Sequence, residues 1–142
     1  MTRPLPGLLV CILLSSLSAC SRGSPSRFDL SGTVTFNGRP VPAGLIAINP
    51  DLSKGNDGPQ GLAEIRDGRF DTRGLKKGGP SGPVILMIDG FDGVAQPESP
   101  YGKPLFVGYK VRVELPAAAS EQNIDVPKSA EANVKKAFAP LP

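Results

Sequence analysis

The sequence predicts an all-β fold, a seven-stranded β-sandwich, that follows an N-terminal export signal. Three observations carry this prediction. Glycine and proline account for 17 and 16 of the 142 residues, and they interrupt the chain every few positions, so no long helical pattern survives. Between these breaks, apolar and polar residues alternate with the period of a half-buried strand. The turn-forming clusters recur at the regular spacing of an antiparallel sandwich.

Composition excludes several classes of function. The chain has no histidine and no tryptophan, and without histidine neither Ser-His-Asp catalysis, Cys-His catalysis nor most zinc enzyme designs are available. Lysine and arginine number 16 against 13 acidic residues, a net charge of +3. These charges are scattered and mixed in sign, unlike the dense basic face of a nucleic-acid-binding protein. We therefore expect no enzymatic activity, no cofactor and no nucleic-acid partner.

Residues 1–19 have the layout of a secretory signal. Arg3 is followed by a mostly apolar segment over residues 5–17 and then by small residues, and the segment is too short for a membrane-spanning helix. Its last residues and the cysteine after them resemble the lipobox of bacterial lipoproteins: Leu17, Ser18, Ala19 and Cys20.

The lipobox resemblance implies that the signal is cleaved before Cys20 and that Cys20 is then acylated. Two or more acyl chains anchor a protein stably, whereas one gives only marginal membrane binding. Ser21, where an Asp would mark inner-membrane retention, points to the outer membrane. Two alternatives stay open: plain secretion with cleavage near Ser18, which leaves Cys20 as a free thiol, and an uncleaved anchor.

The mature chain divides into three parts. Residues 20–27 form the lipidated cysteine and a polar, flexible tether, of which the last seven residues span about 23–25 Å when extended. Residues 28–127 form the sandwich. Residues 128–142 form a C-terminal tail, which either contains a short helix near 129–138 or remains flexible.

Each strand is predicted from its local pattern. In the first, Phe28, Leu30, Val34 and Phe36 share one parity, and Asn37-Gly38 then makes a turn. The continuous apolar run from Val84 to Ile88 predicts a central strand that is covered on both faces. In the sixth strand, one parity holds Val107, Tyr109, Val111, Val113 and Leu115. The seven predicted strands are 28–36, 43–49, 61–66, 69–72, 82–90, 105–115 and 121–127.

Several motifs resemble those of carboxypeptidase regulatory-like (transthyretin-like) domains. The segment Ser31–Gly44, SGTVTFNGRPVPAG, resembles their opening, and Asp67-Gly68-Arg69-Phe70 resembles their next hairpin. Together with residues 90–93, 100–106 and 125–127, the set resembles small planctomycete lipoproteins of this type. The resemblance covers residues 28–127. It implies a transthyretin-like or immunoglobulin-like sandwich without catalytic residues.

Oxygen-bearing side chains gather in two segments, where we expect turn chemistry and no metal site, with calcium binding as the alternative. The candidate ligands are Asp51, Asp57, Asp89 and Asp92. An EF-hand loop that begins at Asp51 would need Gly and Glu at its sixth and twelfth positions, where Asn56 and Leu62 stand. Turn chemistry explains these residues instead, because Asp and Asn side chains accept hydrogen bonds from nearby backbone.

The long loop 91–104 is the candidate partner-binding surface. Its prolines stiffen it, so little order must be gained on binding. If successive strands run up and down, loops 37–42, 66–68 and 91–104 share the end far from the tether. Loops 50–60, 73–80 and 116–120 then share the tether end. The candidate contact residues at the far end are Arg39, Glu98, Tyr101 and Lys103.

These observations predict a membrane-anchored envelope lipoprotein with a non-catalytic β-sandwich that serves as an interaction or structural module. Its partners would be the membrane, through the lipid, and an envelope protein or glycan. The alternative is a secreted or anchored ligand-binding module for a glycan or calcium.

Overall fold

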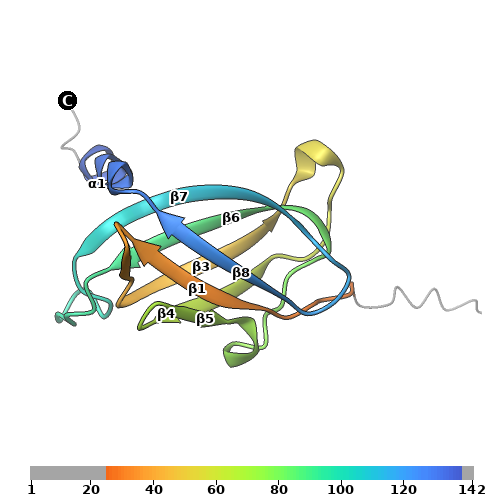
Figure 1. The fold of residues 1–142 in the computed structure, drawn as a ribbon, viewed down its shortest axis with the longest axis horizontal. Helices are drawn as coiled ribbons and strands as arrows, with labels where there is room; N and C mark the ends of the chain where they lie inside the picture. Colours follow the sequence, from red (N-terminus) through yellow and green to blue (C-terminus); the bar gives the residue numbers. More distant parts are fainter. Residues whose placement is uncertain (1–24, 139–142) are drawn as a thin grey trace, which may run out of the picture.

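The computed structural model describes residues 25–138, which form one mostly antiparallel sheet of eight strands curled into a half-barrel (Figure 1). The strand order is β8-β1-β5-β4-β3-β6-β7, and the short β2 also pairs with β1. The strands are β1 (Leu30–Phe36), β2 (Arg39–Pro40), β3 (Ala43–Pro50), β4 (Gly61–Arg66), β5 (Arg69–Asp71), β6 (Gly82–Phe91), β7 (Pro104–Leu115) and β8 (Ser120–Val126).

The all-β prediction is confirmed, and a strand lies in each of the seven predicted segments. The finer prediction of a seven-stranded sandwich is not confirmed. The two-residue β2 is an additional strand, and the strands belong to one continuous sheet. Because this sheet curls, β1 and β8 cross in front of β3 and β6 (Figure 1).

β1 and β8 form a parallel pair, which the sequence pattern did not indicate. Their register runs from Leu30 opposite Ser120 to Phe36 opposite Val126. The Thr33 hydroxyl donates to Asn123 Oδ1 at 2.7 Å, and the Thr35 hydroxyl donates to Asp125 Oδ1 at 2.6 Å. The first and last strands of the domain are thereby joined along their whole length.

The core lies inside the curl. Ile46 and Ile48 of β3 and Leu86 and Ile88 of β6 are fully buried, in alternation with less buried neighbours. β6 is central, as predicted, because it pairs with β3 and β7. The prediction that both of its faces are covered was wrong. The intervening side chains of β6 on the outer face are only half-buried, because no second layer covers that face within residues 25–138.

β7 contributes its predicted parity to the core, and a bulge adds one residue of the other parity. Tyr109, Val111 and Val113 pack against the core as half-buried residues. Phe106, of opposite parity, is fully buried. The register of β6 and β7 shifts between Ile88 and Gly90, where Gly108 has a φ of 63° and donates its N–H to Asp89 Oδ1 at 2.6 Å. Such a bulge turns the strand locally and reverses the face on which its side chains lie.

The C-terminal segment is helical over part of its length. A 3₁₀ turn (Lys128–Ala130) leads into α1 (Glu131–Ala137), which packs against β7. Of the two alternatives for this segment, the helix is the one observed. No helix within residues 25–138 is long and apolar enough to cross a membrane.

We predict that Gly32→Ala destabilises the domain by roughly 2–4 kcal/mol, because overpacking and positive-φ strain act together. A Cβ at Gly32 would lie 1.8 Å from the Gln122 carbonyl oxygen of β8, and its φ is 152°. Urea unfolding measures the effect. The matched control is Gly74→Ala, at a position with open space around the added Cβ, which should change stability by less than about 0.5 kcal/mol. Equal effects of the two substitutions would contradict the assigned role of Gly32.

Candidate functional site

The chain enters the domain at one end of the half-barrel. Phe28 and Gly79 exchange backbone hydrogen bonds at 2.8 and 3.0 Å. Arg27 Nη1 donates to the carbonyl oxygens of Gln60 and Gly78 at 2.7 and 2.8 Å. Ser120 N–H donates to the Asp29 carbonyl at 3.0 Å. Loops 50–60, 73–80 and 116–120 therefore meet at the tether end, as predicted.

The other three loops meet at the opposite end. Asp67 N–H donates to the Pro42 carbonyl at 2.9 Å, which joins the turn 66–68 to loop 37–42. Gly93, at the start of the long loop, lies close against Pro42. This grouping was also predicted, and it leaves Arg39, Glu98 and Lys103 exposed at the far end.

The long loop 92–103 is held by its own hydrogen bonds. Asp92 Oδ1 accepts from the backbone N–H groups of Val94 and Lys103 at 2.9 and 3.0 Å, and Gly93 N–H donates to the Tyr101 carbonyl at 3.0 Å. The Tyr101 ring packs on Phe91, with a centroid separation of 5.7 Å. Tyr101 is therefore half-buried against the sheet, apart from the exposed Arg39, Glu98 and Lys103.

The Tyr101 hydroxyl belongs to a charged network on β4. It donates to Glu64 Oε1 at 3.1 Å, while Arg66 donates to Glu64 Oε2 through Nε at 3.1 Å and Nη2 at 2.5 Å. The Arg66 hydrogen bond, and after it the Tyr101 hydrogen bond, lower the pKa of Glu64. Burial, followed by the bond to Glu64, raises the pKa of Tyr101.

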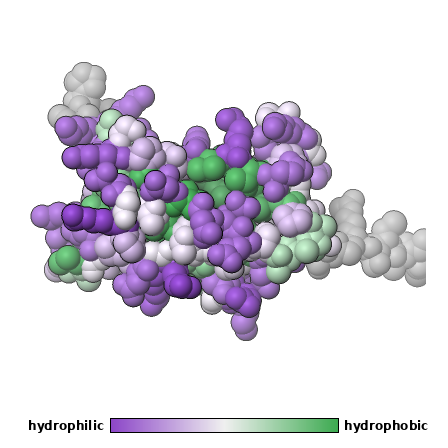
Figure 2. Space-filling model, in the orientation of Figure 1, coloured by the Kyte–Doolittle hydropathy of each residue, from purple (hydrophilic) through white to green (hydrophobic). Residues whose placement is uncertain are grey.

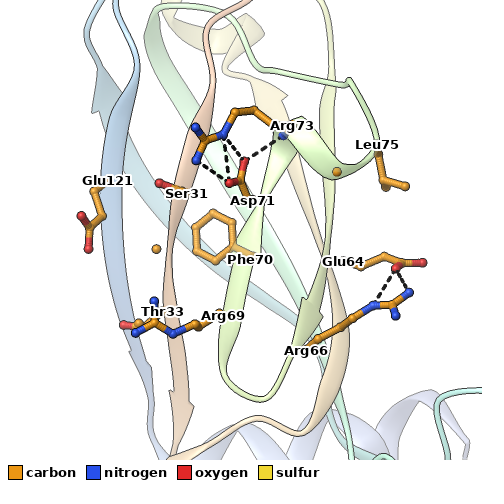
Figure 3. A pocket seen from close by; sticks show the side chains of 12 residues that line it. Ser31, Thr33, Glu64, Arg66, Arg69, Phe70, Asp71, Arg73, Leu75 and Glu121 are labelled. Carbon is orange, nitrogen blue, oxygen red and sulfur yellow. Dashed lines mark hydrogen bonds and ion pairs between the residues drawn. The ribbon is translucent and has the colours of Figure 1, made fainter.

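A groove of about 590 Å³ lies beside this network (Figure 3). Twelve residues line it: Ser31, Gly32, Thr33, Glu64, Arg66, Arg69, Phe70, Asp71, Arg73, Gly74, Leu75 and Glu121. Most come from β1, β4, β5 and the 3₁₀ turn after β5 (Thr72–Gly74). Sequence reasoning missed this groove. The signal was present, because charged residues alternate on both sides of the Asp67-Gly68 turn and so share one face of the hairpin.

Two like charges face each other in the groove. Arg66 and Arg69 are cross-strand partners in the β4–β5 hairpin, an arrangement that is destabilising unless nearby acids compensate. Arg66 is compensated by Glu64. Arg69 forms no ion pair with any residue in the described range 25–138, and its guanidinium lies near Thr33 in Figure 3.

The charges of the groove balance, because three arginines oppose Glu64, Asp71 and Glu121. Arg73 donates two hydrogen bonds to the carboxylate of Asp71, from Nε to Oδ1 at 2.9 Å and from Nη2 to Oδ2 at 2.6 Å. These bonds lower the pKa of Asp71, because they stabilise its charged form. The groove thus offers charged donors, charged acceptors and the Ser31 hydroxyl side by side, which suits a ligand rich in hydroxyl groups.

The four calcium candidates do not form one cluster. Asp51 Oδ1 accepts from Ser53 N–H at 3.1 Å and from the Ser53 hydroxyl, which lowers the pKa of Asp51. Asp89 binds the β7 bulge, Asp92 organises the long loop at the far end, and Asp57 is exposed. Within residues 25–138, no group of three or more His, Cys, Asp or Glu side chains is placed to hold a metal ion.

The predicted cleavage and lipidation residues, Leu17, Ser18, Ala19 and Cys20, lie outside the described residues. Comparisons with protein-family models, curated proteins and solved structures give no significant match to the chain. The resemblance to carboxypeptidase regulatory-like domains therefore rests on the sequence motifs and stays a prediction.

We predict that the Glu64 network stabilises the fold above about pH 4–5 and that this contribution is lost in acid. Because the folded pKa of Glu64 is lowered, the stabilisation is present above the unfolded pKa and disappears as the pH falls through the folded pKa. Glu64→Gln should therefore flatten the fall in melting temperature between about pH 5 and pH 2. The control is Glu98→Gln in the exposed loop, which should leave the curve unchanged. Parallel curves for wild type and Glu64→Gln would contradict the assignment.

Proposed function

We propose that this protein is a lipid-anchored protein of the bacterial cell envelope, at the outer membrane, whose β-domain is a non-catalytic interaction or structural module. The lipobox from Leu17 to Cys20 supports the anchor. The observation that carries the proposal is the position of Arg27 and Phe28, whose contacts with residues 60, 78 and 79 fix where the chain enters the domain. The few residues between Cys20 and Arg27 would then hold that end of the domain near the bilayer.

Charge at the tether end supports this orientation. Lys54, Lys76 and Lys77 are exposed there, and cations close to a membrane are attracted to anionic headgroups. The far end, with Arg39, Glu98 and Lys103, would then point away from the lipid, toward an envelope protein or glycan. Within residues 25–138, the three carboxylates with lowered pKa values, Asp51, Glu64 and Asp71, are each held by hydrogen bonds from neighbouring protein side chains, as carboxylates in structural networks are.

We predict that Cys20→Ala abolishes both the diacylglycerol mass increment and the partition into membranes. Intact mass spectrometry and fractionation of the protein, expressed in a lipidating host, measure the two effects. Cys11→Ala is the matched control, because Cys11 lies in the signal and would leave with it, so its mature product should match wild type. A soluble, unmodified wild-type chain would contradict the anchor and favour plain secretion.

A second function, glycan binding, is favoured by one observation, the groove with interspersed donors and acceptors. Sugar hydroxyls donate to carboxylates, and guanidinium groups bind carboxylates or hydroxyl oxygens of a sugar. Arg69 is the residue best placed to bind such a ligand, since no carboxylate within residues 25–138 pairs with it.

We predict that wild-type protein binds uronic-acid-containing oligosaccharides and that Arg69→Ala weakens this binding about tenfold, the loss of one charge-assisted hydrogen bond. Isothermal titration calorimetry measures the affinity. Arg39→Ala, which removes an exposed arginine at the far end, is the control and should bind like wild type. Absence of saturable binding, or equal losses in both variants, would contradict a glycan site in the groove.

A further inference from the structure

The half-barrel has an open seam between its two edge strands. Within residues 25–138, β7 pairs only with β6, and β8 pairs only with β1. The four residues 116–119 join these strands, yet the strands do not pair with each other. Each therefore presents one row of backbone N–H and C=O groups without a strand partner, and such edges are templates for pairing with another chain.

The floor of the seam is apolar. Four half-buried residues of β7, which borders the seam, pack against the core: Leu105, Tyr109, Val111 and Val113. Figure 2 shows hydrophobic residues gathered in a hollow over β6 and β7, framed by hydrophilic side chains. α1 lies over one end of β7 and leaves the rest of the hollow uncovered (Figure 1). Contiguous apolar surface with a polar rim is typical of an interaction site.

The two rims of the seam carry opposite charge. On the outer face of β7, Lys110 and Arg112 are exposed, followed by Glu114 near the strand end. On the outer face of β8, Glu121 and Asp125 are exposed. A basic rim and an acidic rim on the same chain are complementary to each other, so a second copy can satisfy both at once.

We propose that the seam is the interface of a homodimer, in which β7 of each copy lies antiparallel to β8 of the other. A two-fold axis parallel to the strands makes both contacts together, as an isologous interface requires. It also joins the outer face of each copy to the outer face of its partner, so that Lys110 of one copy meets Glu121 of the other. Arg112 already lies 3.6 Å from Asp51 of its own chain, and Asp125 accepts from Thr35, so Lys110 and Glu121 are the pair without a partner within residues 25–138. An axis perpendicular to the strands would instead pair β8 with β8 and bring Glu121 against Asp125, which is repulsive.

The same axis keeps the two tether ends together. Because a rotation about the strand direction does not reverse that direction, Arg27 and Phe28 of both copies emerge at the same end of the dimer. Both lipid anchors could then enter one membrane, and two anchors hold far more firmly than one. This alignment rests on the proposed function, whereas the charge pairing does not.

The test is the molecular mass in solution of the mature chain with Cys20→Ala, which cannot be lipidated, measured by light scattering over a range of concentrations. This choice separates the dimer from the anchor, because a failure of lipidation leaves the result unchanged. We expect a reversible dimer. A monomeric mass at about 100 μM would overturn the proposal, because such an interface would be weaker than even low-affinity specific complexes.

Charge reversal tests the arrangement of the strands. Lys110→Glu and Glu121→Lys each place like charges across the seam and should weaken the dimer about tenfold or more, whereas the two changes in one chain exchange the rims and should restore wild-type affinity. Neither side chain forms a hydrogen bond or ion pair among residues 25–138, so folding should be retained. Lys54→Glu at the tether end is the control and should dimerise normally. A dimer that is insensitive to the single reversals, or one that the double change does not restore, would overturn the pairing of β7 with β8.

Discussion

The seven-residue parallel pairing of β1 with β8 is the constraint on which the rest of the structure depends. β1 joins the start of the domain to its end. It pairs with β8 along one edge and with β5 and β2 along the other. The contact requires Gly32, since any side chain there would collide with the Gln122 backbone. Because the last strand pairs with the first, the sheet curls, and β1 and β8 cross in front of β3 and β6 (Figure 1).

The curl explains which surfaces are buried and which remain open. Its inner face holds a continuous apolar core, from Leu30 on β1 through Ile46 on β3 to Leu86 on β6. The outer face has no covering layer within residues 25–138, so charges accumulate there and neutralise one another locally, as in the pairs of Arg66 with Glu64 and Arg73 with Asp71. The curl stops before β7 reaches β8, and this incomplete closure creates the seam.

The domain therefore has three surfaces of different character. The end at which Arg27 is held carries exposed lysines, and in the proposed orientation it would face anionic headgroups. The far end carries a loop that its own hydrogen bonds and the Tyr101–Glu64 contact hold in place, which gives a fixed rather than a mobile surface. The seam runs between these ends along the strands. In the proposed dimer, it would set two tethers side by side without covering either end, and its acidic rim would include Glu121, which also lines the groove around Arg69.

Local sequence was sufficient to determine the strand positions, the hairpin turns, the inward parity of β7 and the two groups of loops. Period-two alternation and turn residues such as Asn37-Gly38 act over a few neighbouring positions, so they can be read from the chain directly. The predictions of an export signal and of lipidation at Cys20 likewise rest on local motifs. Only the tertiary structure decided the parallel pairing of β1 with β8, whose contact between Thr33 and Asn123 joins positions 90 residues apart. It also decided the half-buried outer face of β6, the bulge at Gly108 that buries Phe106, the groove around Arg69 and the seam. Each of these depends on which distant strand becomes a neighbour, and a period-two pattern specifies a buried face without specifying the partner that buries it.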